Sequence, residues 1–291
     1  MPLKIRIKNY LELCKPRITF FCLMMTGGGM ILAHHKISLI SVLATFVATA
    51  FSVASANTYN MVYERHSDKF MKRTQFRPMV VGKISVLNAL MFATILAILS
   101  LLIFGFFVNI LTAGLSLFAL IFYAAIYTPL KARTPLALVI GAIPGAMPPL
   151  LGWTAADNKL TLPALALFSV LFAWQMPHFI AISLMHKKDY ASAGIKVIPV
   201  VRGDDNAKIQ SVLWSLCLFV FSLSLVYFKL GSIIYTVFAV TLGVIFVYMS
   251  IVGITKPTPA WPRNFFFASL LYLPILIIGL IVDRSYLFFF T

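Results

Sequence analysis

The amino-acid sequence predicts an all-α protein that crosses a membrane many times as a bundle of helices. Two observations support this prediction. The first is composition, because 61% of the 291 residues are hydrophobic and only 11% are charged, whereas a soluble domain carries about a quarter charged residues. The second is that the apolar residues fall into long blocks, most of them near the ~20 residues that a helix needs to cross hydrocarbon.

Each apolar block is predicted to be one transmembrane helix. The nine blocks are residues 18–33, 37–60, 84–108, 110–128, 135–153, 161–185, 209–228, 230–254 and 264–282. The block at 135–153 contains three prolines, which membrane helices tolerate when neighbouring groups satisfy the freed backbone. We expect a single transmembrane domain over residues 1–291, embedded in a lipid bilayer, with a polar cavity that opens to the cytoplasmic side.

The basic residues follow the predicted topology. With a cytoplasmic N-terminus and alternating helices, 20 of the 24 Lys and Arg residues lie on the cytoplasmic side, which is the excess typical of membrane proteins. The net charge of +16 therefore indicates topology and no nucleic-acid partner. The first apolar run lacks a small-residue cleavage site and is expected to remain as a helix. We expect a multi-pass protein of the cytoplasmic (inner) membrane with a cytoplasmic N-terminus.

The second block ends in a ladder of polar side chains. Asn60, Glu64 and Asp68 are spaced four residues apart, with Asn57 about one turn earlier. If the helix continues to Asp68, these side chains share one face. Two carboxylates so close repel each other unless a cation lies between them, and carboxylate and carboxamide oxygens suit Mg²⁺, which is often completed by substrate phosphates.

Basic residues follow this ladder directly. Lys72, Arg73 and Arg77 come within nine residues of Asp68, and guanidinium groups match phosphate oxygens in two-pronged pairs. Acids for a metal and arginines for an anion together predict a magnesium–diphosphate site at a membrane interface. The alternative is that the acids cap the helix while the bases only obey the topology, although acids at membrane depth are rare and usually functional.

The sixth block is predicted to end on the same side of the membrane. Pro177 is expected to kink its helix, and His178 follows within the apolar run. Asp189 lies eleven residues later and would share a face with His178 if the helix persists, with Lys188 beside it. The imidazole could ligate iron, pass a proton or bind a carboxylate, or it could be a packing histidine.

Other polar and small residues have two readings each. The loop "YTPLKARTP" contains Tyr127, Lys131 and Arg133, which either extend the phosphate cradle or anchor the loop. The run "GAIPGAMPPLLGW" offers small residues for close helix packing and prolines that open space for a bulky ligand. His34 and His35 fall on the opposite side, and we assign them no role. Three scattered cysteines indicate neither a disulfide framework nor a thiolate metal site.

These motifs resemble those of the UbiA-type intramembrane prenyltransferase superfamily. Its Asn-x-x-x-Asp-x-x-x-Asp signature is matched here by "NMVYERHSD", followed by "RTQFRP". The runs "KPRIT", "YTPLKARTP", "GAIPGAMPPLLGW", "WQMPHF" and "KDYASAGIKVIPVV" resemble the heme-modifying branch of the superfamily, and together they extend from residue 15 to about 201. Two departures stand out: Glu64 replaces the middle Asp, and "PHF…KKDY" stands where the superfamily has a second Asp-rich motif.

The resemblance implies an enzyme that transfers a farnesyl group from farnesyl diphosphate to a vinyl group of heme b, leaving the hydroxyethylfarnesyl side chain of heme O. It implies that Asn60, Glu64 and Asp68 hold Mg²⁺, while Lys72, Arg73, Arg77, Lys131 and Arg133 neutralise the leaving diphosphate and His178, Lys188 and Asp189 line the heme site. It also implies heme A synthase or heme-copper oxidase assembly proteins as partners.

Three alternatives remain at this point. One is a prenyltransferase of the same superfamily that acts on a quinone precursor or a chlorophyll-like ring. Another is a secondary transporter in which the acids relay protons or cations, although transporters place such charges in mid-membrane. A purely structural or assembly role would leave the spaced acids unexplained.

Overall fold

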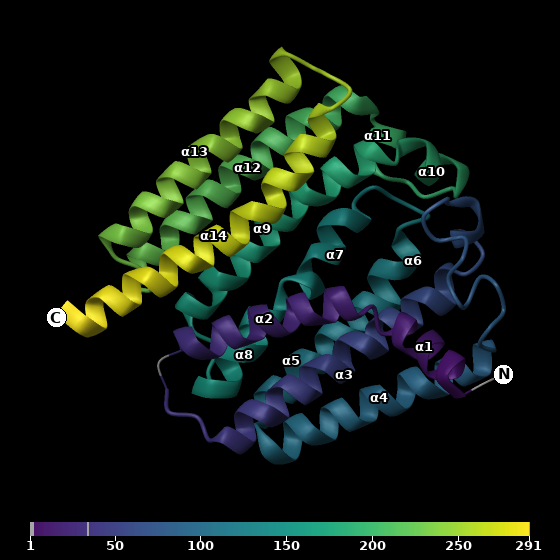
Figure 1. The fold of residues 1–291 in the computed structure, drawn as a ribbon, viewed down its shortest axis with the longest axis horizontal. Helices are drawn as coiled ribbons and strands as arrows, with labels where there is room; N and C mark the ends of the chain where they lie inside the picture. Colours follow the sequence, from purple (N-terminus) through teal and green to yellow (C-terminus); the bar gives the residue numbers. More distant parts are fainter. Residues whose placement is uncertain (1–2, 34, 291) are drawn as a thin grey trace. The chain divides into compact units, whose positions relative to one another are not determined.

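The computed structural model describes residues 3–33 and 35–290, and the side chains of residues 5–33 and 35–283; His34 lies outside the described residues. Within this part, the chain is helical and contains no strand (Figure 1). The elements are α1 (Leu3–Leu13), α2 (Pro16–Leu32), α3 (Leu39–Glu64), η1 (Asp68–Phe70), α4 (Val86–Phe107), α5 (Ile110–Ile121), η2 (Phe122–Tyr127), α6 (Thr128–Leu130), α7 (Ala137–Gly145), α8 (Met147–Asp157), α9 (Leu162–Met185), α10 (Lys187–Ser192), α11 (Ile198–Val201), α12 (Gly203–Tyr227), α13 (Ile233–Thr255) and α14 (Trp261–Phe290).

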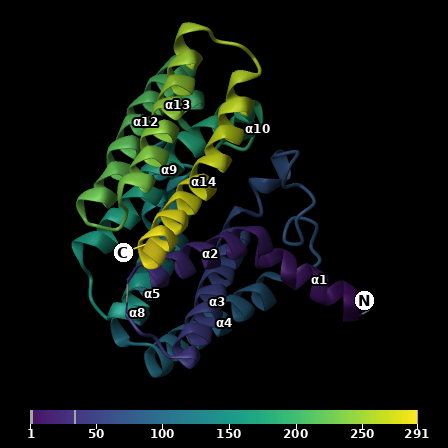
Figure 2. The same cartoon turned by 60° about the vertical axis from the view of Figure 1, so that its left-hand side comes forward.

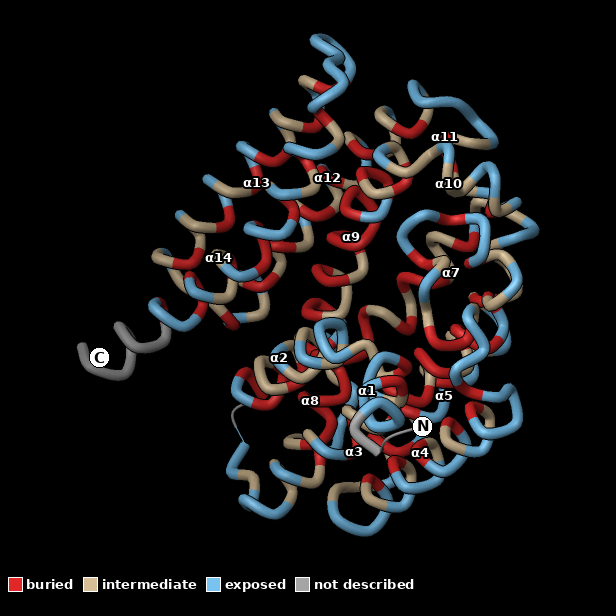
Figure 3. Tube along the Cα trace, turned by 45° about the vertical axis from the view of Figure 1, so that its right-hand side comes forward, coloured by how far each residue is buried: buried red, intermediate tan, exposed pale blue. Residues whose placement is uncertain are grey.

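The predicted membrane helices are present. Eight helical stretches of the described chain are long and apolar enough to cross a membrane, and α2, with 17 residues, is a further shorter apolar helix. At 1.5 Å per residue α2 is about 26 Å long, at the lower limit of what spans a bilayer. Large apolar side chains along α4, α12 and α13 are exposed, as lipid-facing side chains are (Figure 3). The all-α, multi-pass membrane architecture is therefore confirmed.

The chain divides into two compact units, which we describe separately. The first contains Met1–Leu160 and Lys188–Lys196, and the second contains Thr161–Lys187 and Val197–Thr291. In the first unit α3 packs along α4, and α2 packs along α8 (Figures 1 and 2). A side chain on Gly152 would collide with the backbone of Thr26 in α2, so the small residues of "GAIPGAMPPLLGW" permit close helix packing. The single-domain assignment remains a prediction.

The second unit is a bundle of four long helices. α12 packs against α9 and α13, and α14 packs against α13 and α9 (Figure 2). Asp283, near the end of α14, is fully buried and accepts hydrogen bonds from the backbone N–H of Ser232 at 2.5 Å and of Tyr235 at 3.3 Å. It also accepts one from the Ser232 hydroxyl. A carboxylate from one helix thereby caps the N-terminus of α13.

Two local features differ from the simple block pattern, and a third agrees with it. The block at 135–153 is two helices, because α7 ends at Gly145 and α8 begins at Met147 with Pro148 in its first turn. Asn109 does separate α4 from α5: its side chain accepts a hydrogen bond from the Thr112 N–H at 2.8 Å and caps α5. Helix α1 was not predicted, since its eleven residues mix charged and apolar side chains without an apolar block.

Candidate active site at the end of α3

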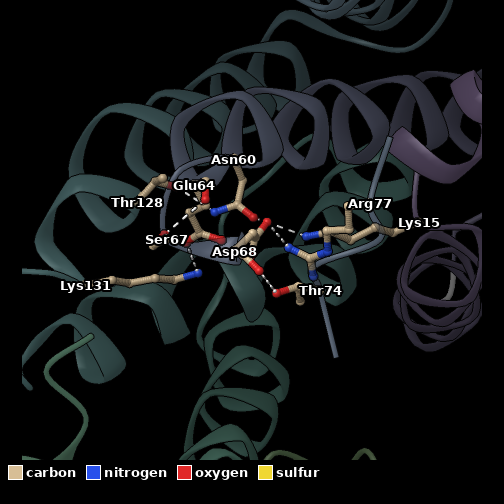
Figure 4. A network of polar contacts seen from close by, with 9 residues as sticks. All are labelled: Lys15, Asn60, Glu64, Ser67, Asp68, Thr74, Arg77, Thr128 and Lys131. Atoms are coloured by element: carbon tan, nitrogen blue, oxygen red, sulfur yellow. Dashed lines mark hydrogen bonds and ion pairs between the residues drawn. The ribbon is translucent and has the colours of Figure 1, made fainter. Parts of the chain in front are cut away.

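The polar ladder lies where α3 ends. Asn57, Asn60 and Glu64 are buried in the last turns of the helix. The helix does not continue to Asp68, which was the condition for a shared face: α3 stops at Glu64, and Asp68 begins the 3₁₀ turn η1. The Ser67 hydroxyl donates to the Glu64 carbonyl oxygen at 3.0 Å, which satisfies one of the open carbonyls at the helix end. Asp68 is 1% exposed and still lies beside Glu64 (Figure 4).

Each member of the ladder has its own basic partner, as Figure 4 shows. Lys131 Nζ lies 2.7 Å from Glu64 Oε1. Arg77 Nη1 lies 2.7 Å from Asp68 Oδ2. Lys15 Nζ donates to Asn60 Oδ1 at 3.2 Å. The site therefore combines three basic side chains with two carboxylates, which fits an additional anion better than a cation alone.

Lys15 was not among the predicted site residues, although it begins the run "KPRIT". It directly precedes α2 and has a φ of 46°, a left-handed conformation that non-glycine residues seldom adopt. Such outliers persist where the surrounding structure holds them, often at functional sites. The sequence signal available was the Lys-Pro pair at a helix start, which does not reveal a contact with Asn60, 45 residues away.

The environment perturbs the ionisation of the residues outside the membrane helices. Burial, and to a smaller extent the nearby Arg77 charge, lower the pKa of Lys15 to about 7. Burial raises the pKa of Asp68, against the opposing effect of Arg77. Burial alone would lower the pKa of Lys131, but the Glu64 charge outweighs it, so the pKa of this lysine is raised well above its ordinary value. Lys131 is therefore a permanent cation next to the ladder.

The donor set fits a hard divalent cation. Asp68 Oδ1 is buried, and among the described residues it has no hydrogen-bond partner. Among the described residues, no group of three or more His, Cys, Asp or Glu side chains could hold a metal ion by itself. A metal held here would rely on two carboxylates, the Asn60 carboxamide and oxygens from its substrate. This pattern is typical of Mg²⁺ with a phosphate ligand and not of a soft transition metal.

A π-helical turn supplies the opposite side of the site. Pro129 lacks a backbone N–H and clashes with regular α-helix, and the preceding η2 forms wider hydrogen bonds, with Thr128 N–H reaching Tyr123 O. Such turns are frequent at functional sites. Thr128 Oγ1 accepts from Asn60 Nδ2 at 3.2 Å, and Lys131 Nζ lies 4.5 Å from the centre of the Tyr127 ring. The predicted Tyr127 and Lys131 are thus brought to the ladder.

Several predicted residues do not contact the ladder. Lys72, Arg73 and Arg133 are exposed, and no ion pair involves them among the described side chains. The pair Lys188 and Asp189 belongs to the short helix α10, which is separated from α9 by a break at His186. The helix therefore does not persist from His178 to Asp189, which was the condition for their sharing a face.

The segment that carries α10 is attached to the first unit. The Ser192 hydroxyl donates to Phe70 O at 3.0 Å, and the Lys196 N–H donates to Lys131 O at 3.0 Å. These bonds join α10 to the segments on either side of the ladder. Lys188 and Asp189 consequently belong to the same compact unit as the acids.

His178 lies in the second unit, within α9. Its Nδ1 lies 2.8 Å from Ser269 Oγ, and its ring stacks on Trp174 with centroids 4.6 Å apart. The ring of Phe266 also packs against the imidazole, with the two ring centroids 5.0 Å apart. Nε2 is involved in no hydrogen bond with a described residue. His35, which received no role, has its Nε2 2.8 Å from Asp157 Oδ1.

Comparison with known proteins finds relatives that match nearly the whole chain. The family model of the UbiA prenyltransferase family matches residues 22–271. A protoheme IX farnesyltransferase from Myxococcus xanthus (strain DK1622) is 41% identical over 277 residues, which is 95% of this chain and 94% of the relative. The resemblance to the heme-modifying branch is thereby confirmed.

Solved structures share the fold. The structure described as digeranylgeranylglyceryl phosphate synthase superposes with a TM-score of 0.81 at 19% identity, covering 95% of this chain and 98% of that one. A UbiA homologue from Archaeoglobus fulgidus, bound to GPP and Mg²⁺, superposes with a TM-score of 0.65 at 19% identity, covering 94% and 99%. The chain therefore belongs to the UbiA prenyltransferase family.

Proposed function

We propose that this protein transfers the farnesyl group of farnesyl diphosphate to a vinyl group of heme b, giving heme O with a hydroxyethylfarnesyl side chain. The observation that carries the proposal is the ladder of Asn60, Glu64 and Asp68, each paired with a basic residue and with Asp68 Oδ1 unpaired among the described residues. The name of the Myxococcus relative supports the choice of donor and acceptor.

The ladder would hold Mg²⁺ against the diphosphate. When bound, the metal supplies charge stabilisation to the departing diphosphate oxygens. Asn60, Glu64 and Asp68 would be its protein ligands, and the longer side chain of Glu64 keeps the charge and ligand type of the family's usual Asp. Three basic side chains lie within 3.2 Å of these ligands: Arg77, Lys131 and Lys15. When the substrate binds, they could form hydrogen bonds with the diphosphate oxygens in place of those with the ladder oxygens.

The reaction proceeds by ionisation. The C–O bond to the diphosphate breaks, the diphosphate leaves with the electron pair, and the farnesyl cation remains. The vinyl π electrons then form the new C–C bond, and water captures the resulting cation beside the ring with loss of a proton. The basic side chains stabilise charge that develops only on departure, which is how preorganised donors accelerate a reaction. Tyr127 presents an aromatic face, which favours cations.

The remaining predicted residues are assigned roles other than metal binding. We assign Lys72, Arg73 and Arg133, all exposed, to attraction of the anionic substrate toward the site, and Asn57 to support of the ladder one turn earlier. His178 would bind the heme iron or a propionate through Nε2, since Nδ1 is engaged by Ser269. Lys188 and Asp189 would line the heme site.

The same proposal includes the protein's setting. A cytoplasmic N-terminus in the cytoplasmic membrane places 20 of the 24 Lys and Arg residues on the cytoplasmic side. The product would pass to a heme A synthase or to the assembly proteins of a heme-copper oxidase. Both assignments rest on sequence alone.

The test compares two acceptors. Purified protein in lipid nanodiscs is incubated with Mg²⁺, labelled farnesyl diphosphate and either heme b or 4-hydroxybenzoate, and products are separated and weighed by mass spectrometry. We expect a labelled heme whose mass has increased by one farnesyl group and one hydroxyl group. A labelled benzoate product with no labelled heme would replace this function with quinone-precursor prenylation.

A further inference from the structure

We propose that Gly141 is a positioning residue for the diphosphate subsite: its missing side chain lets the Tyr127 ring lie against α7, and the ring holds Lys131 beside Glu64. The inference rests on the proposed function, and it adds a residue that contacts neither the acids nor the substrate. Gly141 lies within "GAIPGAMPPLLGW", in the middle of the apolar helix α7.

The first step is the contact between Gly141 and the ring. A Cβ added to Gly141 would lie 2.8 Å from Tyr127 Cζ and closer still to two other ring carbons. Real Cβ atoms do not approach other carbons so closely, so the ring would have to move. Tyr123 stands one turn away with its ring centroid 5.2 Å from that of Tyr127, which restricts movement along η2. The ring must therefore rotate away from α7.

The second step is the effect on Lys131. Its Nζ lies 4.5 Å from the Tyr127 ring centroid and 2.7 Å from Glu64 Oε1. Lysine has four rotatable bonds and holds one geometry only when its surroundings restrict it. The ring forms one wall around Nζ and attracts it through the aromatic face. When the ring rotates, Lys131 loses that wall and no longer points at the position that the diphosphate would occupy.

Other glycines in the chain provide matched comparisons. A Cβ on Gly243 would collide with the Phe219 ring in the second unit, far along the sequence from the ladder. Gly114, in α5 of the first unit, has open space where its Cβ would lie. Gly243→Ala therefore creates a similar collision with an aromatic ring in the unit that does not contain the ladder. Gly114→Ala makes the same substitution in the unit that contains the ladder, but without a collision.

The experiment measures binding separately from chemistry. Full-length protein in nanodiscs is titrated with farnesyl thiodiphosphate, an analogue that does not ionise, in the presence of Mg²⁺, and Tm is recorded for each variant. We expect Gly141→Ala to raise Kd about tenfold, the loss of one cation contact. Gly243→Ala should lower Tm and leave Kd unchanged, while Gly114→Ala should change neither. Equal Kd values for Gly141→Ala and wild type would overturn the inference.

A double variant covers the case in which Gly141→Ala does not fold. Tyr127→Ala removes the ring and every side-chain atom beyond Cβ, so adding Gly141→Ala to it meets no conflict and should leave both Kd and Tm where Tyr127→Ala puts them. A further rise in Kd in the double variant would mean that Gly141 acts without Tyr127, and the inference fails. Wild-type protein that does not bind the analogue would count against the proposed function itself.

Discussion

Two buried aspartates, one in each compact unit, have opposite hydrogen-bond environments. Asp283 is fully buried, and both of its oxygens accept hydrogen bonds from the start of α13. Asp68 is 1% exposed, and Arg77 binds one of its oxygens while the other has no partner among the described residues. A buried carboxylate with complete hydrogen bonding stabilises the fold, whereas an incompletely bonded one is available to a ligand.

The largest effect is expected at Asp68. Asp68→Asn should lower kcat for farnesyl transfer by about 100- to 1000-fold, because a group that holds charge in the transition state is lost. Tm should change little, since the amide keeps the shape and Arg77 is partly exposed. Product formation is measured by mass spectrometry alongside a thermal melt. A fall in Tm that accounts for the lost activity would make Asp68 structural.

Asp283→Asn should give the reverse pattern. The amide leaves α13 donors facing an NH₂ group, at a cost of about 1–3 kcal/mol for a buried unsatisfied group. Tm should fall, while kcat per folded molecule stays at the wild-type value. Ser232→Ala, which removes one of the donors, should show part of the same loss. Wild-type Tm in Asp283→Asn would contradict the capping role.

Two lysines with the same ion-pair distance sharpen the comparison further. Lys131 lies 2.7 Å from the buried Glu64, and Lys187 lies 2.7 Å from the exposed Asp204. Lys131→Met should raise Kd for farnesyl thiodiphosphate at least tenfold, because a buried charge-assisted hydrogen bond is worth about 1.5–3 kcal/mol. Lys187→Met should change neither Kd nor Tm measurably, as exposed pairs contribute little. Equal changes of Kd in the two variants would show that the ion-pair distance, and not the burial of the pair, sets the size of the effect.

The smallest effect separates two arginines of the run "RTQFRP". Arg77 binds Asp68, whereas Arg73 is exposed. Arg73→Ala should lower kcat/KM only about twofold at low salt, with the difference vanishing at high salt because exposed charges are screened. Arg77→Ala should lower it far more at any salt concentration. A salt-independent loss in Arg73→Ala would place that side chain on the substrate.

The site was predictable where it depends on local spacing. The i, i+4 pattern of Asn60 and Glu64 identified the ladder, because helix periodicity alone places both on one face. Asp68 was identified for the wrong local reason, since the helix ends before it. Lys15 was missed because its contact with Asn60 joins two segments that only packing brings together. The role of Gly141 could not be predicted from the sequence either, since it depends on which side chain fills the space beside it.

The sequence by itself determined the all-α membrane architecture, because long apolar blocks have one stable arrangement in hydrocarbon, where every backbone group must be satisfied within a helix. It also determined which polar residues are unusual, because charge at membrane depth is costly. Only the tertiary structure decided which base pairs with which acid, that Arg77 and not Arg73 meets Asp68, and that Asp283 is a cap. Such choices depend on side-chain directions across packed helices, and sequence spacing does not encode them.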